Sequence, residues 1–124
     1  MFRKQVGQRI ILVMMLLAPS VALAVSEQAE QEISYLLNAI ARSDCRFIRN
    51  GVEYSAGEAR DHMMKKYGYA KPWINTAEDF IRYAASHSSA SGEPYRIRCN
   101  DRTISLSDWL GAALAEFRQR KNPG

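Results

Sequence analysis

Residues 45–55 read CRFIRNGVEYS and contain the pattern that decides the fold. Two short runs with high strand propensity flank Asn50-Gly51. This dipeptide is a strong signal for a two-residue hairpin turn, because both positions tolerate a positive φ angle. Side chains alternate between the two faces of a strand. Cys45 and Phe47 are therefore predicted on one face of the first strand, and Arg46 on the other.

A second hairpin is predicted within residues 94–105, PYRIRCNDRTIS, around the turn Asn100-Asp101. By the same alternation, one face carries Tyr95, Ile97 and Cys99, and the other carries Arg96 and Arg98. If the two hairpins join in one antiparallel sheet, both cysteines face the same side. They could then tie the hairpins together inside the core.

Four segments have the periodicity and the end signals of helices. They are residues 26–43, 55–67, 76–89 and 105–121. The order of helices and hairpins predicts an α+β fold: a small single domain in which two β-hairpins form an antiparallel sheet packed by about four helices.

The boundaries of the middle helices rest on local signals. Ser55 and Glu58 match a capping box, and Gly68 is predicted to end that helix as a left-handed C-cap. Pro72 is expected to hold Lys71 extended in the linker that follows. The apolar stripe of the next helix is expected to continue as far as Ser88.

The first 24 residues have the three parts of a secretory signal peptide: a cationic start, an apolar run from Ile10 to Ala18, and a small-residue site at Ala22-Leu23-Ala24. Cleavage is expected after Ala24, which leaves residues 25–124 as a single exported domain. The apolar run is about half the roughly 20 residues needed to span a bilayer, so an uncleaved membrane anchor is the less favoured alternative. We expect a periplasmic protein with no transmembrane segment after cleavage.

The charge of the chain also changes on cleavage. The 124 residues carry 17 basic and 13 acidic groups, a net charge of +4. Three of the basic residues (Arg3, Lys4 and Arg9) lie in the leader, so the mature part has 14 basic and 13 acidic groups, a net charge of +1. A nearly neutral domain of this size is not typical of a nucleic-acid binder.

The two cysteines, Cys45 and Cys99, both lie in the mature part. Disulfides form and persist in exported proteins, and an even number of cysteines leaves none unpaired. These arguments favour a Cys45–Cys99 disulfide. The alternative is a pair of separate buried thiols.

Several short motifs occur in a fixed order along the mature chain. They are FIRNG at 47–51, Glu58-Ala59 with His62, TAEDFI at 76–81, and ASHSSASG at 85–92 followed by Pro94-Tyr95. The ordered set resembles small exported bacterial proteins of the YfeK type, over most of the mature chain. That family is itself a domain of unknown function, so the resemblance implies no catalytic residue, cofactor or substrate.

The sequence contains little that supports an enzymatic activity. His62 and His87 are the only histidines, and there is no G-x-S-x-G nucleophile elbow. Glu58 and His62 share a helix face at i, i+4, but Glu58 already has a capping role, there is no H-E-x-x-H motif, and the cysteines are expected to be oxidised. No Gly-rich phosphate loop or dinucleotide motif occurs. No catalytic, metal or cofactor site is therefore predicted.

Two groups of residues remain as possible ligand contacts. One is the hydroxyl-rich turn with Ser88, Ser89, Ser91 and Gly92, which could hold an anion or a sugar, or could be a plain turn. The other is the outer face of the sheet with Arg46, Arg96 and Arg98, which could meet an acidic partner or could be a solvated strand face.

These observations lead to a functional hypothesis. We expect a non-enzymatic binding or interaction module of the cell envelope, whose partner is an envelope protein or a cell-wall component. The alternative is a small envelope hydrolase that uses His62 or His87.

Overall fold

The computed structural model describes residues 26–122. The predicted leader, residues 1–24, lies outside this range. The elements follow one another as α2 (Glu27–Arg42), β1 (Arg46–Arg49), β2 (Val52–Tyr54), α3 (Ala56–Ala70), the 3₁₀ helix η1 (Lys71–Trp73), α4 (Ala77–Ala84), β3 (Arg96–Cys99), β4 (Arg102–Ser105) and α5 (Leu106–Lys121).

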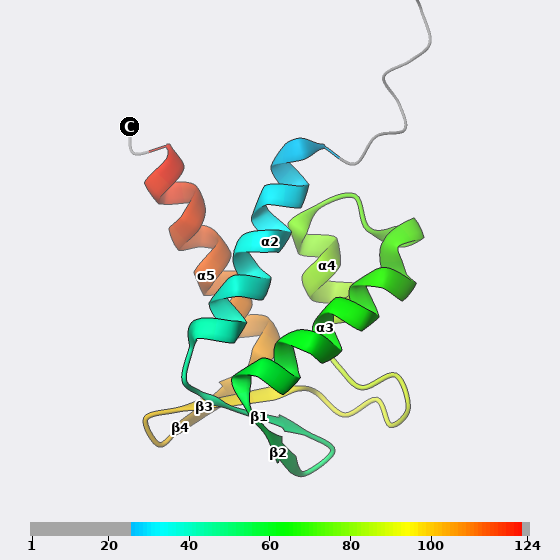
Figure 1. The fold of residues 1–124 in the computed structure, drawn as a ribbon, viewed down its shortest axis with the longest axis vertical. Coiled ribbons are helices and arrows are strands. Elements are labelled where there is room, and N and C mark those ends of the chain that lie inside the picture. Colours follow the sequence, from blue (N-terminus) through cyan, green and yellow to red (C-terminus); the bar gives the residue numbers. More distant parts are fainter. Residues whose placement is uncertain (1–25, 123–124) are drawn as a thin grey trace, which may run out of the picture.

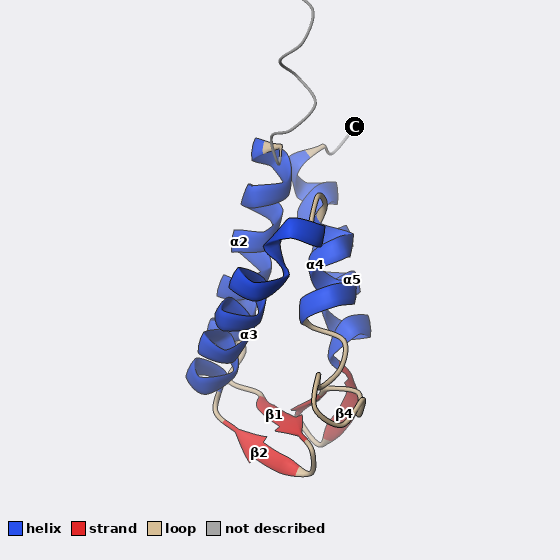
Figure 2. Ribbon diagram, turned by 90° about the vertical axis from the view of Figure 1, so that its right-hand side faces the viewer, coloured by secondary structure: helices blue, strands red, loops and turns tan. Residues whose placement is uncertain are grey.

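The four strands form one antiparallel sheet in the order β2-β1-β3-β4. The two hairpins therefore meet through β1 and β3, where Phe47 pairs with Ile97. The predicted turns are present, with positive φ at Asn50 (52°) and Gly51 (78°) in the first and at Asn100-Asp101 in the second. All the described helices lie on one side of the sheet (Figures 1 and 2). The predicted α+β fold is confirmed.

The two faces of the sheet have the predicted composition. Phe47 and Ile97 are buried against the helices, whereas Arg46 and Arg96 on the opposite face are exposed. Together with the helix residues Phe80, Ile33 and Leu110 and others, the inner face forms one continuous apolar core. Because burial of apolar side chains is the main driving force of folding, this alternation fixes which face of the sheet receives the helices.

The capping boxes at Ser55/Glu58 and Thr76/Asp79 are both present. The prediction that α3 ends at Gly68 is wrong, since the helix continues to Ala70. Lys71 is also helical rather than extended, with φ −46° and ψ −42°. Pro72 sits in the first turn of η1, where a missing N–H removes no hydrogen bond. After α3 and η1 the chain reaches Ile74, whose side chain is buried in the core and only 1% exposed.

The helix that begins at Ala77 is shorter than expected, because α4 ends at Ala84. The Ser86 hydroxyl donates to the Ile81 carbonyl oxygen (2.7 Å), and His87 forms an isolated bridge with Pro94. Ser88 is buried, but it lies in the turn after the helix rather than on its apolar stripe. Local hydrogen bonds at the helix end therefore outweigh the apolar periodicity.

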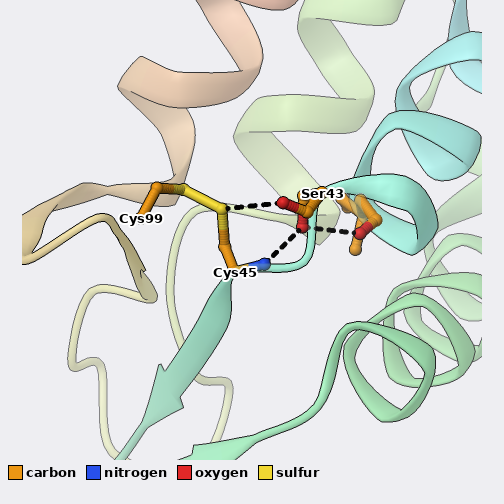
Figure 3. Close-up of a disulfide and its surroundings, with 4 residues drawn as sticks. Ser43, Cys45 and Cys99 are labelled. Carbon is orange, nitrogen blue, oxygen red and sulfur yellow. Dashed lines mark hydrogen bonds between the residues drawn. A yellow bond between two sulfur atoms is a disulfide. The ribbon is translucent and has the colours of Figure 1, made fainter.

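A disulfide joins Cys45 and Cys99, which are 54 residues apart in the sequence (Figure 3). The connection before β1 is held as well, since Cys45 N–H donates to the Ser43 hydroxyl (3.2 Å) and that hydroxyl donates to the Ile40 carbonyl oxygen (2.9 Å). In the chain-entropy model a loop of this length contributes about 4 kcal/mol to stability. The disulfide thus fastens β1 to β3, and the hydrogen bonds of Ser43 hold the start of β1 to the end of α2.

The far ends of three helices are joined by one guanidinium group. Arg118 of α5 donates to both carboxylate oxygens of Glu32 on α2 (2.8 and 2.9 Å) and to both of Glu78 on α4 (2.7 and 3.0 Å). Glu32 is only 4% exposed. The hydrogen bonds from Arg118 hold the pKa of Glu32 and of Glu78 below its usual value. Paired forks of this kind are among the stronger ionic contacts in proteins.

Replacing Arg118 with Met should lower the free energy of unfolding by about 2 kcal/mol, because Glu32 would stay buried without a cation. Breaking a fully buried ion pair costs more than about 2 kcal/mol. The expected loss is smaller here because Arg118 is partly exposed to solvent, which screens the interaction. Urea denaturation measures the change. Arg60→Met is the control, since its pair with Asp61 is exposed and should matter by less than about 0.5 kcal/mol. Equal losses in the two variants would contradict the prediction.

Candidate functional site

A cleft of about 550 Å³ opens between α3, η1, α4 and the connection from α4 to β3. Its lining falls into three groups: the cations Arg49, Lys65 and Lys66; the aromatic residues Tyr69, Trp73, Tyr83 and Tyr95; and the remaining residues His62, Ala70, Ser88, Ser89 and Ala90. We call this the cationic cleft. A smaller cavity of about 150 Å³ shares Arg49, His62 and Tyr95 with it. The volume of the cleft is in the range of small-molecule sites.

One face of α3 supplies a wall of the cationic cleft. His62, Lys65, Lys66 and Tyr69 occupy positions i, i+3, i+4 and i+7, which places them along a single stripe of the helix. The adjoining face of the same helix buries Ala59 and Met63. Burial of these two side chains orients α3 so that the polar stripe borders the cleft.

Tyr95 lies at the centre of the polar contacts. Its hydroxyl accepts a hydrogen bond from Lys66 Nζ (3.0 Å) and lies 3.2 Å from His62 Nε2. Lys66 Nζ also donates to the His87 carbonyl oxygen (2.9 Å). Since Lys66 occupies an acceptor position of the hydroxyl, the hydroxyl hydrogen is free to point at a neutral His62 ring. These contacts connect α3 to both ends of the connection between α4 and β3.

The three groups of this cluster have shifted pKa values. Burial lowers the pKa of Lys66, and the nearby Arg49 lowers it further. The pKa of His62 is lowered by burial first and then by Arg49, Lys66 and Lys65. Burial raises the pKa of Tyr95. Each shift opposes the charged form of the group, and for His62 and Lys66 the cause includes surrounding positive charge.

No carboxylate lines the cationic cleft. Within residues 26–122, Arg49, Lys65 and Lys66 form no ion pair, although Arg49 donates to the Tyr54 hydroxyl (3.0 Å) and lies over its ring. Arg49 and Lys66 are partly buried, whereas Lys65 is exposed. Partly buried cations without a counter-charge are unfavourable on their own. The electrostatics of the cleft therefore favour an anion.

The hydroxyl-rich turn contributes to this cleft only in part. Ser88 and Ser89 line it, whereas Ser91 and Gly92 do not. The buried Ser88 hydroxyl accepts from the N–H groups of Ala90 and Ser91, and the Ser91 hydroxyl donates to Asn50. The hydroxyls of Ser88 and Ser91 thus shape the turn and attach it to the β1–β2 hairpin. The role of the turn as a ligand contact stays a prediction.

The arginines of the outer sheet face lie together as expected. Arg46 pairs with Arg98 in the register of β1 and β3, and Arg96 is on the same face. Glu53 of β2 forms ion pairs with both Arg46 and Arg98, so this face already contains a counter-charge. A binding role for these three arginines stays a prediction.

The catalytic alternative gains no support from the geometry. Within the described residues, neither His62 nor His87 has a serine or threonine hydroxyl as a hydrogen-bond partner, although nucleophilic hydrolysis needs such a pair. Glu58 accepts from the backbone N–H of Ser55 in the capping box. The described part of the chain has no cluster of three metal-ligating side chains.

Sequence reasoning missed most of the cationic cleft. It singled out His62, Ser88 and Ser89 but not the cations and aromatic residues around them. The stripe His62-Lys65-Lys66-Tyr69 was a usable signal, since helical spacing alone puts these side chains together. Trp73 and Tyr83 come from other elements and gave no such signal.

The fold and the cleft define a class of protein: a small, disulfide-bonded α+β domain with a cationic cleft of ligand-binding dimensions. Residues 27–118 match the model of the Family of unknown function (DUF5329), and the chain belongs to this family. It is 42% identical over 72 residues to "Uncharacterized protein YfeK" of Salmonella typhimurium (strain LT2). That alignment covers 57% of this chain and 60% of the relative's length. No solved structure matches significantly.

No helix in the described range is long and apolar enough to span a bilayer.

Replacing His62 with Gln should flatten the pH dependence of stability between about pH 7 and 5. The pKa of His62 is lower in the folded chain than the ordinary 6.5, so the unfolded chain binds more protons in this window. Stability is therefore highest above pH 6.5 and falls as the pH drops toward the folded-state pKa. The lowered pKa values of Glu32 and Glu78 act only below 4.5.

Urea denaturation at a series of pH values provides the measurement. His87→Gln is the matched control, because this histidine is exposed and its side chain lies outside the cluster. The control should keep the wild-type profile. An unchanged profile in the His62 variant would contradict the assignment.

Proposed function

We propose that this protein is an exported, non-enzymatic binding module of the cell envelope that holds an anionic ligand in the cationic cleft. The observation that carries the proposal is the set of three cations, Arg49, Lys65 and Lys66, around a cleft without a carboxylate. An anion would supply the missing counter-charge, and charge-assisted hydrogen bonds to it would be strong in a partly dehydrated cleft.

The cleft is a better candidate than the outer face of the sheet. On the outer face Glu53 already neutralises part of the charge of Arg46 and Arg98. That surface is also a flat sheet face, whereas the cleft is concave and can surround a ligand. In the cleft, Lys66 is held in place by two hydrogen bonds, so less conformational entropy is lost when it binds.

Export is proposed on two grounds. The leader, residues 1–24, has the composition of a cleavable signal peptide, and residues 25–124 would form the exported domain. The Cys45–Cys99 disulfide is consistent with an oxidising compartment such as the periplasm. Within the envelope, an envelope protein or a cell-wall component could present the anionic group.

Mass spectrometry of the protein from a periplasmic fraction tests the export proposal. The mature chain should begin at Val25, and its mass should be two hydrogens below that of the reduced chain. Neither cysteine should react with an alkylating reagent until a reductant is added. A chain that still begins at Met1, or that carries alkylatable thiols, would contradict the proposal.

Binding of inorganic tripolyphosphate tests the anion site. In an NMR titration, the amide shifts should change in α3 and in residues 85–91, and the affinity should fall as salt is added. The double variant Arg49→Gln/Lys65→Gln should bind about tenfold more weakly, since it lacks two of the three cations. Both side chains are at least partly exposed, so the fold should tolerate the changes.

Arg120→Gln/Lys121→Gln is the control, because it removes the same charge at the end of α5, away from the cleft. It should bind as the wild type does. If both double variants bind tripolyphosphate equally weakly, the loss depends only on net charge and not on the cleft. That result would overturn the proposal. So would shift changes centred on Arg46, Arg96 and Arg98, which would favour the outer face of the sheet.

A further inference from the structure

The cationic cleft has a second property that an anion alone does not explain. Tyr69, Trp73 and Tyr83 all line it, and they are 76%, 66% and 46% exposed. The described residues include only two other exposed large apolar side chains, Val52 and Met64, and neither lines the cleft. Exposed apolar surface that gathers in one place marks an interaction site.

These aromatic rings come from three different elements. Tyr69 lies near the end of α3, Trp73 on η1 and Tyr83 on α4. None of them packs against another aromatic ring of the described chain, whereas Tyr35 stacks on Phe117 and Tyr67 meets Phe80 edge to face. The Arg82 guanidinium lies over the Tyr83 ring, 5.2 Å from its centroid, whereas no cation of the described chain lies over Tyr69 or Trp73. The ring faces of Tyr69 and Trp73 are therefore available to a ligand. The backbone of helices and of the 3₁₀ turn holds them in fixed positions, which favours stacking at low entropic cost.

We propose that the ligand is an anionic glycan, a short chain of sugar rings that carries carboxylate or phosphate groups. This inference rests on the proposed function and names its ligand class. A sugar ring has an apolar C–H face, which packs on an aromatic ring, and polar edges, which need hydrogen-bond partners. The cleft offers both aromatic rings and the exposed hydroxyl of Ser89.

The cations are placed to pair with the charged groups of such a chain. Lys65 and Lys66 lie one helical turn before Tyr69 on the same stripe of α3, and Trp73 follows on η1. A glycan lying along this stripe would meet cations and aromatic rings in succession. The volume of about 550 Å³ leaves room for a short oligosaccharide segment rather than for a single small ion.

Single-stranded nucleic acid also combines negative charge with flat rings. A glycan is favoured here because the mature part, residues 25–124, has a net charge of only +1, so the long-range attraction that typifies nucleic-acid binders is weak. The proposed export also places the protein in the compartment of envelope glycans. Nucleic acid is therefore an outcome of the test.

The experiment uses the oxidised mature protein and isothermal titration calorimetry. The probes are trigalacturonic acid, its neutral methyl ester and inorganic tripolyphosphate. Trigalacturonic acid should bind at least about tenfold more tightly than either of the others, since only it offers both sugar faces and charges. Binding should also change the fluorescence of the exposed Trp73.

Trp73→Ala separates the glycan inference from the proposed function. Trp73 is 66% exposed, so its loss should leave the fold intact. The variant should bind trigalacturonic acid about tenfold more weakly while its affinity for tripolyphosphate stays unchanged. Trp73→Tyr keeps a stacking ring and should restore most of the affinity. Lys65→Gln should weaken binding of both anions.

Three results would overturn the inference. If tripolyphosphate binds as tightly as trigalacturonic acid, and Trp73→Ala affects neither, then the anion site stands and the glycan class fails. If no anion binds in the cleft, both proposals fail. If a thymidine hexanucleotide binds about tenfold more tightly than trigalacturonic acid, the ligand class is nucleic acid instead.

Discussion

The pairing of β1 with β3 is the constraint on which the rest of the structure depends. These strands are distant in sequence, and the Cys45–Cys99 disulfide fastens them together at one end. Their register pairs Phe47 with Ile97 and Ile48 with Arg96, so that Arg49 and Tyr95 adjoin the last pair. Both of those residues line the cationic cleft. The same pairing therefore builds the floor of the core and positions two residues of the candidate site.

Positive charges are neutralised by carboxylates in one part of the fold and not in another. At the far ends of the helices, Arg118 is bound by two carboxylates, and nearly all of the Glu32 side chain is removed from water. In the cationic cleft, Lys66 is partly buried, but its partners are a carbonyl oxygen and a hydroxyl. The first arrangement is complete within the fold. The second leaves positive charge uncompensated, and this is the physical basis for assigning the cleft a ligand.

Much of the fold could be predicted because its signals are local. Asn50-Gly51 specifies a hairpin through its own backbone preferences, and the Ser55/Glu58 capping box specifies a helix start. The prediction that α3 ends at Gly68 was wrong, because a glycine ends a helix only where the chain must turn. Here the chain continues toward the buried Ile74. The candidate site was predicted only where one helix carries it. His62 was singled out, whereas Trp73 and Tyr83 needed the packing of η1 and α4.

The sequence by itself determined the hairpins, the helix starts, the two faces of the sheet and the side on which both cysteines lie. Only the tertiary structure decided which cations are neutralised. From sequence, Arg118 was one of several basic residues at the end of a helix, yet it meets Glu32 and Glu78, which lie 86 and 40 residues away. The reason is physical: strand and helix preferences act between neighbours in the chain, whereas the energy of a charge depends on distances and burial that exist only after the helices pack.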